Sequence, residues 1–352
     1  MPQAPQTVSR TDIARALARG SCASLAHLPT PLDLCLRLAA ELGGPKIWFK
    51  RDDCTGLAFG GNKVRQHEYI LGDALSRGVD VVIQGAASQS NQSRQLAAAA
   101  ARLGIECILM PRKDAQFAHV QGNQLIARQF GATIIPIEAS ASTKQAKQDM
   151  AVRLEASGRR PMILGMGAER ALTLAAVAYV GAYLELVEQF ETLGEALPTH
   201  IYVTSQVSTQ AGLQAGAELL GHDVKICGIN PMDARNEAYE TPDEIASRCR
   251  AAAEFLGFKL GLGPERVSNS TAFVGKDYGK PAKAAQEAAA LLARTEGILV
   301  DPVYSAKGFS GLVSDIQSGR LNKSDRAVFL HTGGLPAIFS YASSYGDIGQ
   351  GD

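Results

Sequence analysis

The residue best placed to carry chemistry in this sequence is Lys63, which directly follows Gly60, Gly61 and Asn62. It stands in a glycine turn between a predicted strand and a predicted helix. Glycine permits tight backbone geometry and lets a ligand approach the chain closely. A lysine amine whose surroundings keep it partly neutral can form a Schiff base with a carbonyl compound. Because most lysines are solvated surface charges, this short segment needs support from the rest of the sequence.

A polar segment at residues 89–95, Gln-Ser-Asn-Gln-Ser-Arg-Gln, follows a short apolar run and opens an alanine-rich helical stretch. Serine or asparagine at such a position commonly caps a helix. Equally, the free backbone N–H groups of a helix N-terminus can bind an anion such as a substrate carboxylate. In that second interpretation the hydroxyl of Ser90 and the amide of Asn91 add directed hydrogen bonds. The sequence alone leaves both interpretations open.

A hydroxyl-rich segment at residues 204–212, Thr-Ser-Gln-Val-Ser-Thr-Gln-Ala-Gly, also follows an apolar run and precedes a helical stretch. Turns of this kind bind phosphate through backbone N–H groups and side-chain hydroxyls. Helix capping explains the serines and threonines equally well.

Two segments near the C-terminus, residues 301–307 and 331–336, each follow a strand-like run. A tyrosine in a crevice can stack on a ring, donate a hydrogen bond or relay a proton. For Tyr304 the simpler alternative is a half-buried packing residue. His331 is interpreted as a core histidine, and Gly333-Gly334 as a turn.

The elements that must position these residues alternate along the chain. Runs rich in Val and Ile predict strands at 46–51, 81–84, 107–110, 133–137, 162–164, 201–204, 224–229 and 327–331. Helical periodicity predicts helices at 92–103, 122–130, 171–189, 210–220, 283–294 and 310–318. Continuous apolar strands separated by helices indicate an α/β fold with buried parallel sheets. We expect a small α/β domain at 65–175 and a larger, discontinuous domain at 1–64 and 176–352, with ligands at the carboxyl ends of the strands.

Composition and charge narrow the class of protein. The 352 residues include 35 Lys and Arg against 35 Asp and Glu, so no basic excess indicates nucleic acid or an anionic membrane. Six cysteines without a Cys-x-x-Cys pair indicate neither a zinc site nor a disulfide framework, and we expect reduced thiols in a cytoplasmic protein. No apolar run is expected to reach the ~18 residues that span a bilayer. The N-terminal 20 residues lack the apolar region of a secretory signal, so we expect an amphipathic first helix there.

Taken together and in this order, the segments resemble the pyridoxal-phosphate enzymes of fold type II, in the group that contains 1-aminocyclopropane-1-carboxylate (ACC) deaminase and D-cysteine desulfhydrase. The resemblance runs from about Leu28 to Tyr341, and the string Lys50 to Arg65 is its most specific part. It implies a two-lobed α/β enzyme in which each lobe is a mostly parallel sheet flanked by helices. It also implies pyridoxal 5'-phosphate as cofactor, a small amino-acid substrate and a homodimer.

The same resemblance assigns roles to residues of this chain. Lys63 would hold the cofactor covalently and move the substrate proton, while Ser90, Tyr304 and Tyr278 would complete the catalytic group. The residues implied to bind the cofactor are Lys63, Asn62, Asn91, Ser205, Gln206, Val207, Ser208, Thr209, Tyr304, Ser305 and Thr332. Those implied to contact the substrate are Ser90, Asn91, Gln92, Tyr278 and Gly165.

Two positions bear on which bond is broken. ACC deaminases carry Glu directly after the stacking tyrosine and Leu before the late glycine pair, whereas this chain carries Ser305 and Thr332. A carboxylate near the pyridine nitrogen favours its protonated form, so a serine there gives a weaker electron sink. That arrangement suits elimination of a good β-leaving group, and we expect conversion of D-cysteine to pyruvate, ammonia and sulfide.

Other positions keep alternatives open. Gln92 matches the ACC deaminases, Val207 replaces a glycine usual in the phosphate turn, and the stretch after Gly165 lacks the usual Ser-Asn. A β-branched residue does not readily adopt φ > 0. The alternatives are an ACC deaminase, an L-cysteate sulfo-lyase and a non-catalytic ligand-binding homologue.

Overall fold

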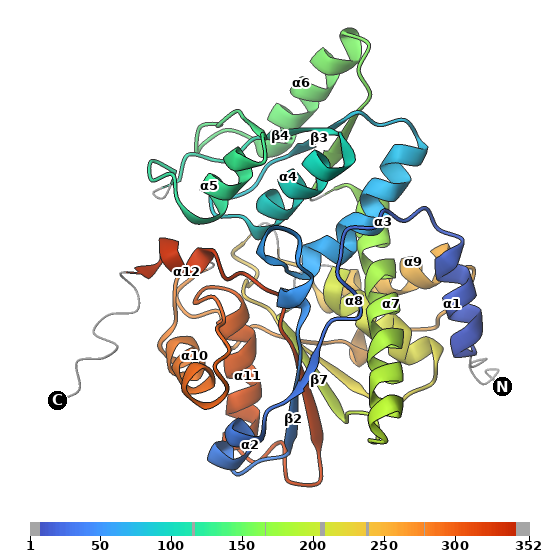
Figure 1. Ribbon diagram of the computed structural model, residues 1–352, viewed down its shortest axis with the longest axis vertical. Helices are drawn as coiled ribbons and strands as arrows, with labels where there is room; N and C mark the ends of the chain where they lie inside the picture. Colours follow the sequence, from blue (N-terminus) through green and yellow to red (C-terminus); the bar gives the residue numbers. More distant parts are fainter. Residues whose placement is uncertain are drawn as a thin grey trace.

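The computed structural model describes residues 8–114, 117–165, 167–204, 208–236, 239–277 and 279–342. Its strands form two sheets, each covered by helices (Figure 1). The strands are β1 Leu32–Leu34, β2 Lys46–Lys50, β3 Val81–Gln84, β4 Glu106–Leu109, β5 Thr133–Ile134, β6 Pro161–Leu164, β7 His200–Thr204, β8 Lys225–Ile229, β9 Ser268–Ser270 and β10 Arg326–Leu330. The helices are α1 Arg10–Ala18, α2 Leu36–Leu42, α3 Asn62–Ser76, α4 Asn91–Leu103, α5 Gly122–Gln129, α6 Thr143–Ala156, α7 Glu169–Leu193, α8 Ser208–Leu219, α9 Pro242–Phe255, α10 Lys283–Glu296, α11 Ser305–Gln317 and α12 Ala337–Ser340.

The larger sheet has the strand order β1-β2-β10-β7-β8-β9, and only β1 runs antiparallel to its neighbour. Alternate residues of β2 enter different cores: Ile47 and Phe49 pack toward α10 and α11, and Trp48 packs toward α7. Successive strand residues point to opposite faces, so a strand apolar at every position is buried on both. The predicted α/β fold with mostly parallel sheets is therefore confirmed.

The smaller sheet has the order β5-β4-β3-β6, with every pair parallel. Val82 faces a core shared with α4, while Val81 and Ile83 face a second core on the side of α6. In Figure 1 this sheet and its helices α4, α5 and α6 lie together at one end of the molecule.

Helix α7 departs from one expectation drawn from the sequence. Over its 25 residues it is long and apolar enough, by length and composition alone, to cross a membrane. However, 67% of its most apolar stretch is buried inside the protein, where it packs against α3, α8 and α9. Its apolar character is explained by this central place in the core.

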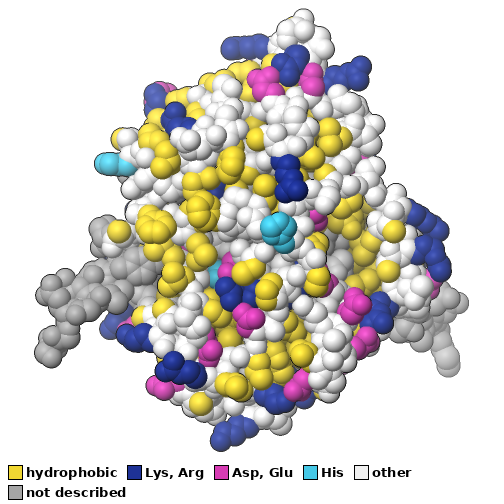
Figure 2. Space-filling view, viewed as in Figure 1, with side chains coloured by type: hydrophobic (Ala, Val, Ile, Leu, Met, Phe, Trp, Pro, Cys, Tyr) yellow, Lys and Arg dark blue, Asp and Glu magenta, His cyan; other side chains and the backbone are white. Residues whose placement is uncertain are grey.

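Surface charge, the cysteines and the first helix can be compared with the expectations from the sequence. Figure 2 shows basic and acidic side chains interspersed on the face in view, without a large area of one sign. All six cysteines are free thiols. An amphipathic first helix is present as expected, capped by Ser9 and burying Ile13.

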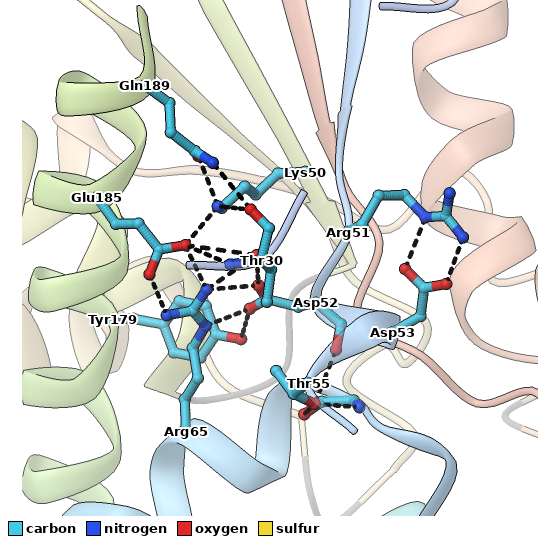
Figure 3. A network of polar contacts seen from close by, with 11 residues as sticks. Thr30, Lys50, Arg51, Asp52, Asp53, Thr55, Arg65, Tyr179, Glu185 and Gln189 are labelled. Atoms are coloured by element: carbon cyan, nitrogen blue, oxygen red, sulfur yellow. Dashed lines mark hydrogen bonds and ion pairs between the residues drawn. The ribbon is translucent and has the colours of Figure 1, made fainter. Parts of the chain in front are cut away.

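A buried ionic cluster ties α3 to α7 and to the segment after β2 (Figure 3). Arg65 of α3 donates to both oxygens of Asp52, at 2.9 and 3.0 Å, and to both oxygens of Glu185 of α7, at 2.8 and 2.9 Å. Lys50 forms an ion pair with Glu185, and the hydroxyl of Tyr179 donates to Asp52. Burial alone would raise the pKa of Glu185, but Arg65 and Lys50 outweigh burial and lower it to about 2.

Candidate active site

The turn before Lys63 requires its two glycines. Gly60 and Gly61 adopt φ angles of 65° and 131°, which residues other than glycine rarely adopt. A Cβ on Gly60 would lie 1.9 Å from the carbonyl oxygen of Asp53, and one on Gly61 would lie 2.6 Å from the amide of Gln95. The turn therefore delivers Lys63 as the second residue of α3, close against α4.

Lys63 lies in surroundings that favour a neutral amine. Its side chain is partly buried, and its Nζ has no hydrogen-bond partner in the described part of the chain. Burial lowers its pKa to about 8, and the carboxylate of Glu240 opposes that shift in part. An appreciable fraction of the amine is therefore unprotonated near neutral pH, as a nucleophile or base requires.

The segment after β10 packs directly on this turn. The N–H of Asn62 donates to the carbonyl of Thr332 at 3.0 Å, and a Cβ on Gly333 would lie 2.7 Å from Cα of Gly61. His331 is fully buried, with Nε2 2.7 Å from the carbonyl of Leu299 and Nδ1 accepting from Gly333. The interpretation of His331 as a satisfied core histidine is confirmed.

The N-terminus of α8, which follows β7 of the larger sheet, contacts α3. Asn62 Nδ2 and Gln66 Nε2 both donate to Oγ1 of Thr209, at 2.9 and 3.0 Å. Because both bonds use oxygen lone pairs, the hydroxyl hydrogen of Thr209 remains available to a further acceptor. Ser208 donates from its hydroxyl to Leu172. The neighbouring predicted residues Ser205, Gln206 and Val207 lie outside the described residues.

The N-terminus of α4 lies beside the same turn. Ser90 caps the helix, accepting from the N–H of Ser93 at 3.2 Å. Asn91 accepts through Oδ1 from Asn123 and Arg94, and its Nδ2 has no partner among the residues described. Gln92 is partly exposed. The capping interpretation is thus confirmed, and the remaining first-turn N–H groups stay available to an anion.

Gly165 and Tyr304 complete the sequence-predicted set. Gly165 follows β6, which pairs with β3, so its turn adjoins the segment that leads to Ser90. Tyr304 donates from its hydroxyl to the carbonyl of Thr204 at 3.4 Å and is partly buried. Tyr278 lies outside the described residues.

Ser305 and Asp301 form a buried hydrogen-bonded turn. Its hydroxyl bonds to the carboxylate of Asp301 and to the carbonyl of Gly333, at 3.0 Å for the latter. The backbone N–H groups of Val303, Tyr304 and Ser305 also donate to Asp301. Burial raises the pKa of Asp301, and these donors oppose the rise. The carboxylate thereby fixes the turn that presents Tyr304.

A separate groove of about 840 Å³ is lined by α1, α7 and the Leu28–Pro29 segment. None of the predicted site residues lines it. The predicted site residues gather instead at the junction around Lys63, and this junction is the candidate active site.

Comparison with known proteins agrees with this geometry. Residues 23–333 match the family described as "Pyridoxal-phosphate dependent enzyme". The chain belongs to this family. It is similar to the D-cysteine desulfhydrase of Salmonella typhi, at 37% identity over 317 residues, covering 89% of this chain and 94% of that protein. The corresponding protein of Salmonella paratyphi B is 36% identical over the same length.

Solved structures give the same fold. A structure described as the ACC deaminase homologue superposes with a TM-score of 0.83 at 30% identity, covering 95% of this chain and 98% of that one. The apo form of Escherichia coli diaminopropionate ammonia lyase, at 17% identity and a TM-score of 0.66, shares the fold alone. As a pyridoxal-phosphate enzyme of fold type II, the chain uses pyridoxal 5'-phosphate as its cofactor.

The residues around Lys63 fit that cofactor. The hydroxyls of Thr204 and Thr332 are buried without a partner in the described residues. Buried polar atoms in folded proteins are normally paired. A ligand rich in hydrogen-bonding groups would meet this need, and the partly neutral Lys63 matches its aldehyde.

Several site residues are not evident from the sequence. Gln66, His67 and Arg94 are polar residues inside helices, where exposure is the usual expectation, yet they are 3%, 1% and 0% exposed. For Gln66 and His67 a signal was present, because they lie three and four residues after Lys63 and such spacing shares one helix face.

Proposed function

We propose that the protein is a pyridoxal-phosphate-dependent carbon–sulfur lyase that eliminates the β-substituent of a small amino acid. D-cysteine is the proposed substrate, giving pyruvate, ammonia and sulfide with uptake of one water. The observation that carries the proposal is the partly neutral Lys63 at the meeting point of the α4 and α8 N-termini. The similarity to proteins named D-cysteine desulfhydrase supports the choice of substrate.

The proposed roles follow from the positions of the side chains. Bound pyridoxal phosphate supplies the electron sink for the negative charge that develops at the substrate α-carbon. The amine of Lys63 holds the cofactor and, once released, takes the proton from that carbon. Its lowered pKa keeps a base available near neutral pH.

The two helix N-termini divide the anionic groups between them. Ser90 and the first N–H groups of α4 bind the substrate carboxylate, with Gln92 and Gly165 beside them. Thr209, held by Asn62 and Gln66, donates its hydroxyl to the phosphate, together with the backbone N–H of Ser208; residues 205–207, outside the described residues, are assigned to the same group by the family resemblance. We assign Tyr304, Thr332 and Asn91 to the cofactor, with Tyr304 against its ring; the family resemblance assigns Tyr278, which lies outside the described residues, to the substrate.

ACC deamination is the second candidate. The likeness to the ACC deaminase homologue favours it. Against it, Ser305 places a hydroxyl, already bonded to Asp301 and Gly333, where those enzymes carry a glutamate. Without that carboxylate the cofactor is less able to draw electrons from a substrate that has no α-proton.

The compartment, the assembly and the domain boundaries belong to the same proposal. We propose a cytoplasmic homodimer in which residues 65–175 form the small domain and residues 1–64 with 176–352 form the large one. Free thiols at all six cysteines support a reducing compartment. The interspersed charges in Figure 2 support a small-molecule substrate rather than nucleic acid or a membrane.

The test is product formation by the purified holoenzyme. Pyruvate and sulfide are measured with D-cysteine, L-cysteine and L-cysteate, and 2-oxobutyrate is measured with ACC. We expect the fastest turnover with D-cysteine. Faster formation of 2-oxobutyrate would replace this proposal with the deaminase. Sulfite from L-cysteate would retain the elimination and change the leaving group, and no turnover of any of these would favour a binding protein.

A further inference from the structure

Arg94 is a fully buried cation without an ion-pair partner among the described residues. It lies on α4 with 0% exposure, and its electrostatic partner Asp301 makes no ion pair with it. Its donors reach only neutral oxygens: Asn91 Oδ1 at 3.2 Å, Asn123 Oδ1 at 2.8 Å and the carbonyl of Gly60 at 2.8 Å. Its Nε has no hydrogen-bond partner in the described part of the chain. A charge buried in this way is costly unless something anionic lies near it.

The charge on Arg94 persists despite burial. Burial lowers its pKa, and the carboxylate of Asp301 opposes the shift. Arginine's intrinsic basicity is high enough to keep the guanidinium protonated. Asp301 is meanwhile occupied by Ser305 and by three backbone N–H groups. The positive charge of Arg94, beside Asn91 and the carbonyl of Gly60 in the Lys63 turn, is therefore not fully compensated by the described residues.

The guanidinium also fixes how two amides are turned. It carries donors only, so the atoms of Asn91 and Asn123 that face it must be their oxygens. Asn123 then points Nδ2 at Asn91 Oδ1, at 2.9 Å, and at the carbonyl of Gln89, at 2.8 Å. Both bonds to Asn91 end on its oxygen, so its Nδ2 faces away from the pair and is free to donate.

The family resemblance assigns Asn91 to the phenolic oxygen of the cofactor. We propose that Arg94 is the positioning residue that turns the Asn91 amide so that Nδ2 donates to that oxygen, and that the charge of Arg94 stabilises the oxygen as an anion. This inference rests on the proposed function, which puts the cofactor on Lys63. The bond from Arg94 to Gly60 couples the same guanidinium to the turn that presents Lys63.

The consequence is a shift in the protonation of the linkage between Lys63 and the cofactor. A donor and a positive charge beside an oxygen favour its deprotonated form, so the proton shared near that oxygen is released at lower pH. Lys63 is also influenced by Glu240 and has His67 beside it. Burial and the nearby Lys63 lower the pKa of His67 to about 3, so this imidazole does not titrate in the range of the experiment.

The experiment is a pH titration of the visible absorbance of the holoenzyme between about pH 6 and pH 10. The parent is compared with Arg94→Met, which removes charge and donors, and with Arg94→Lys, which keeps the charge but loses the planar fork. Asn123→Ala keeps Arg94 and frees the Asn91 amide. Arg102→Met is the matched control, since Arg102 is an exposed arginine later on α4.

Arg94→Met is expected to raise the apparent pKa of the absorbance change by about one to two units, the size of a lost charged hydrogen bond. Arg94→Lys and Asn123→Ala are expected to shift it less, in the same direction, and Arg102→Met not at all. If Arg94→Met does not fold, the other two variants decide. A parent-like titration in Arg94→Lys and Asn123→Ala overturns the inference. Failure of the parent itself to form a Lys63-dependent visible band would instead overturn the proposed function on which the inference rests.

Discussion

Two sides of helix α3 treat buried polar groups in opposite ways. On the side of Arg65, each charge meets a fixed partner within the protein, in the cluster with Asp52, Glu185 and Lys50. On the side of Lys63, buried polar atoms of Arg94 and Gln95 on the neighbouring helix α4 have no partner in the described chain. Paired groups hold the helix in place, whereas unpaired groups are prepared for a ligand.

The comparison explains why one short segment of sequence serves two purposes. Residues 62–67 present Asn62, Lys63 and Gln66 to the site and Arg65 to the ionic cluster, as the 3.6-residue period of a helix dictates. Changes on the first side should affect ligand binding and turnover. Changes on the second side should affect folding.

The largest expected effect belongs to Lys63→Ala. Loss of the amine removes both the attachment of the cofactor and the base, so turnover of D-cysteine should fall by at least about a thousandfold. The unfolding midpoint in denaturant should stay close to that of the parent, since Nζ makes no hydrogen bond in the described residues. Lys113→Ala, at a half-exposed lysine, is the control. Near-normal turnover in Lys63→Ala would refute the mechanism.

Arg65→Met should produce the opposite pattern. It leaves Asp52 and Glu185 buried without their shared cation, which costs about 3–5 kcal/mol. We expect a large drop in the denaturation midpoint, while protein that remains folded keeps the visible band of the cofactor. If stability is unchanged and the band disappears, the assignment of the two sides is wrong.

Acid should remove the stability that the ionic cluster contributes to the folded protein. The pKa of Glu185 is lowered from 4.5 to about 2 in the folded protein. A carboxylate with a depressed folded pKa contributes stability that is fully present above its unfolded pKa and is lost as pH falls through its folded pKa. We therefore expect the free energy of unfolding to decline between about pH 4.5 and pH 2, by up to about 3 kcal/mol. Glu185→Gln should be less stable at pH 7 and should show a flatter decline; an equally steep decline would place the effect elsewhere.

The smallest effect is expected for Gly333→Ala, which touches the site side without removing any polar group. A Cβ there would lie 2.7 Å from Cα of Gly61, at a residue with φ of 92°. Strain of about 1–3 kcal/mol should displace the Lys63 turn and weaken cofactor binding about tenfold or more. Gly319→Ala is the matched control, because it has a similar φ of 73° but open space around it. Equal cofactor affinity in both variants would show that the close approach of Gly333 to Gly61 does not position the Lys63 turn.

The two kinds of region also differ in how far sequence could predict them. Strand β3 begins and ends where its apolar run does, and β2, β7 and β10 agree within one residue, because buried parallel strands are apolar throughout. The short strands β1 and β9, of three residues each, were missed, since edge strands carry little pattern. The turn before Lys63 could be predicted from the sequence because only glycine fits at its two positions.

Hydrogen bonds between residues far apart in the sequence could not be predicted from such local patterns. In the sequence Arg94 is an ordinary helical arginine. Its place in the site depends on hydrogen bonds to Asn123 and Gly60, which lie 29 and 34 residues away. Asp301 likewise acquires its role from its own turn, where it bonds to Ser305, and Ser305 in turn bonds to the carbonyl of Gly333, 28 residues away. Such contacts depend on how the two sheets are brought together, which local patterns do not determine.

The most direct test of the account is the visible spectrum of the purified protein with pyridoxal phosphate, recorded before and after D-cysteine is added. We predict a visible band that Lys63→Ala lacks, that changes when D-cysteine is added, and that is accompanied by accumulating pyruvate. A band that persists in Lys63→Ala, or that ignores every amino acid offered, would contradict the assignment of Lys63 as the catalytic lysine of a carbon–sulfur lyase.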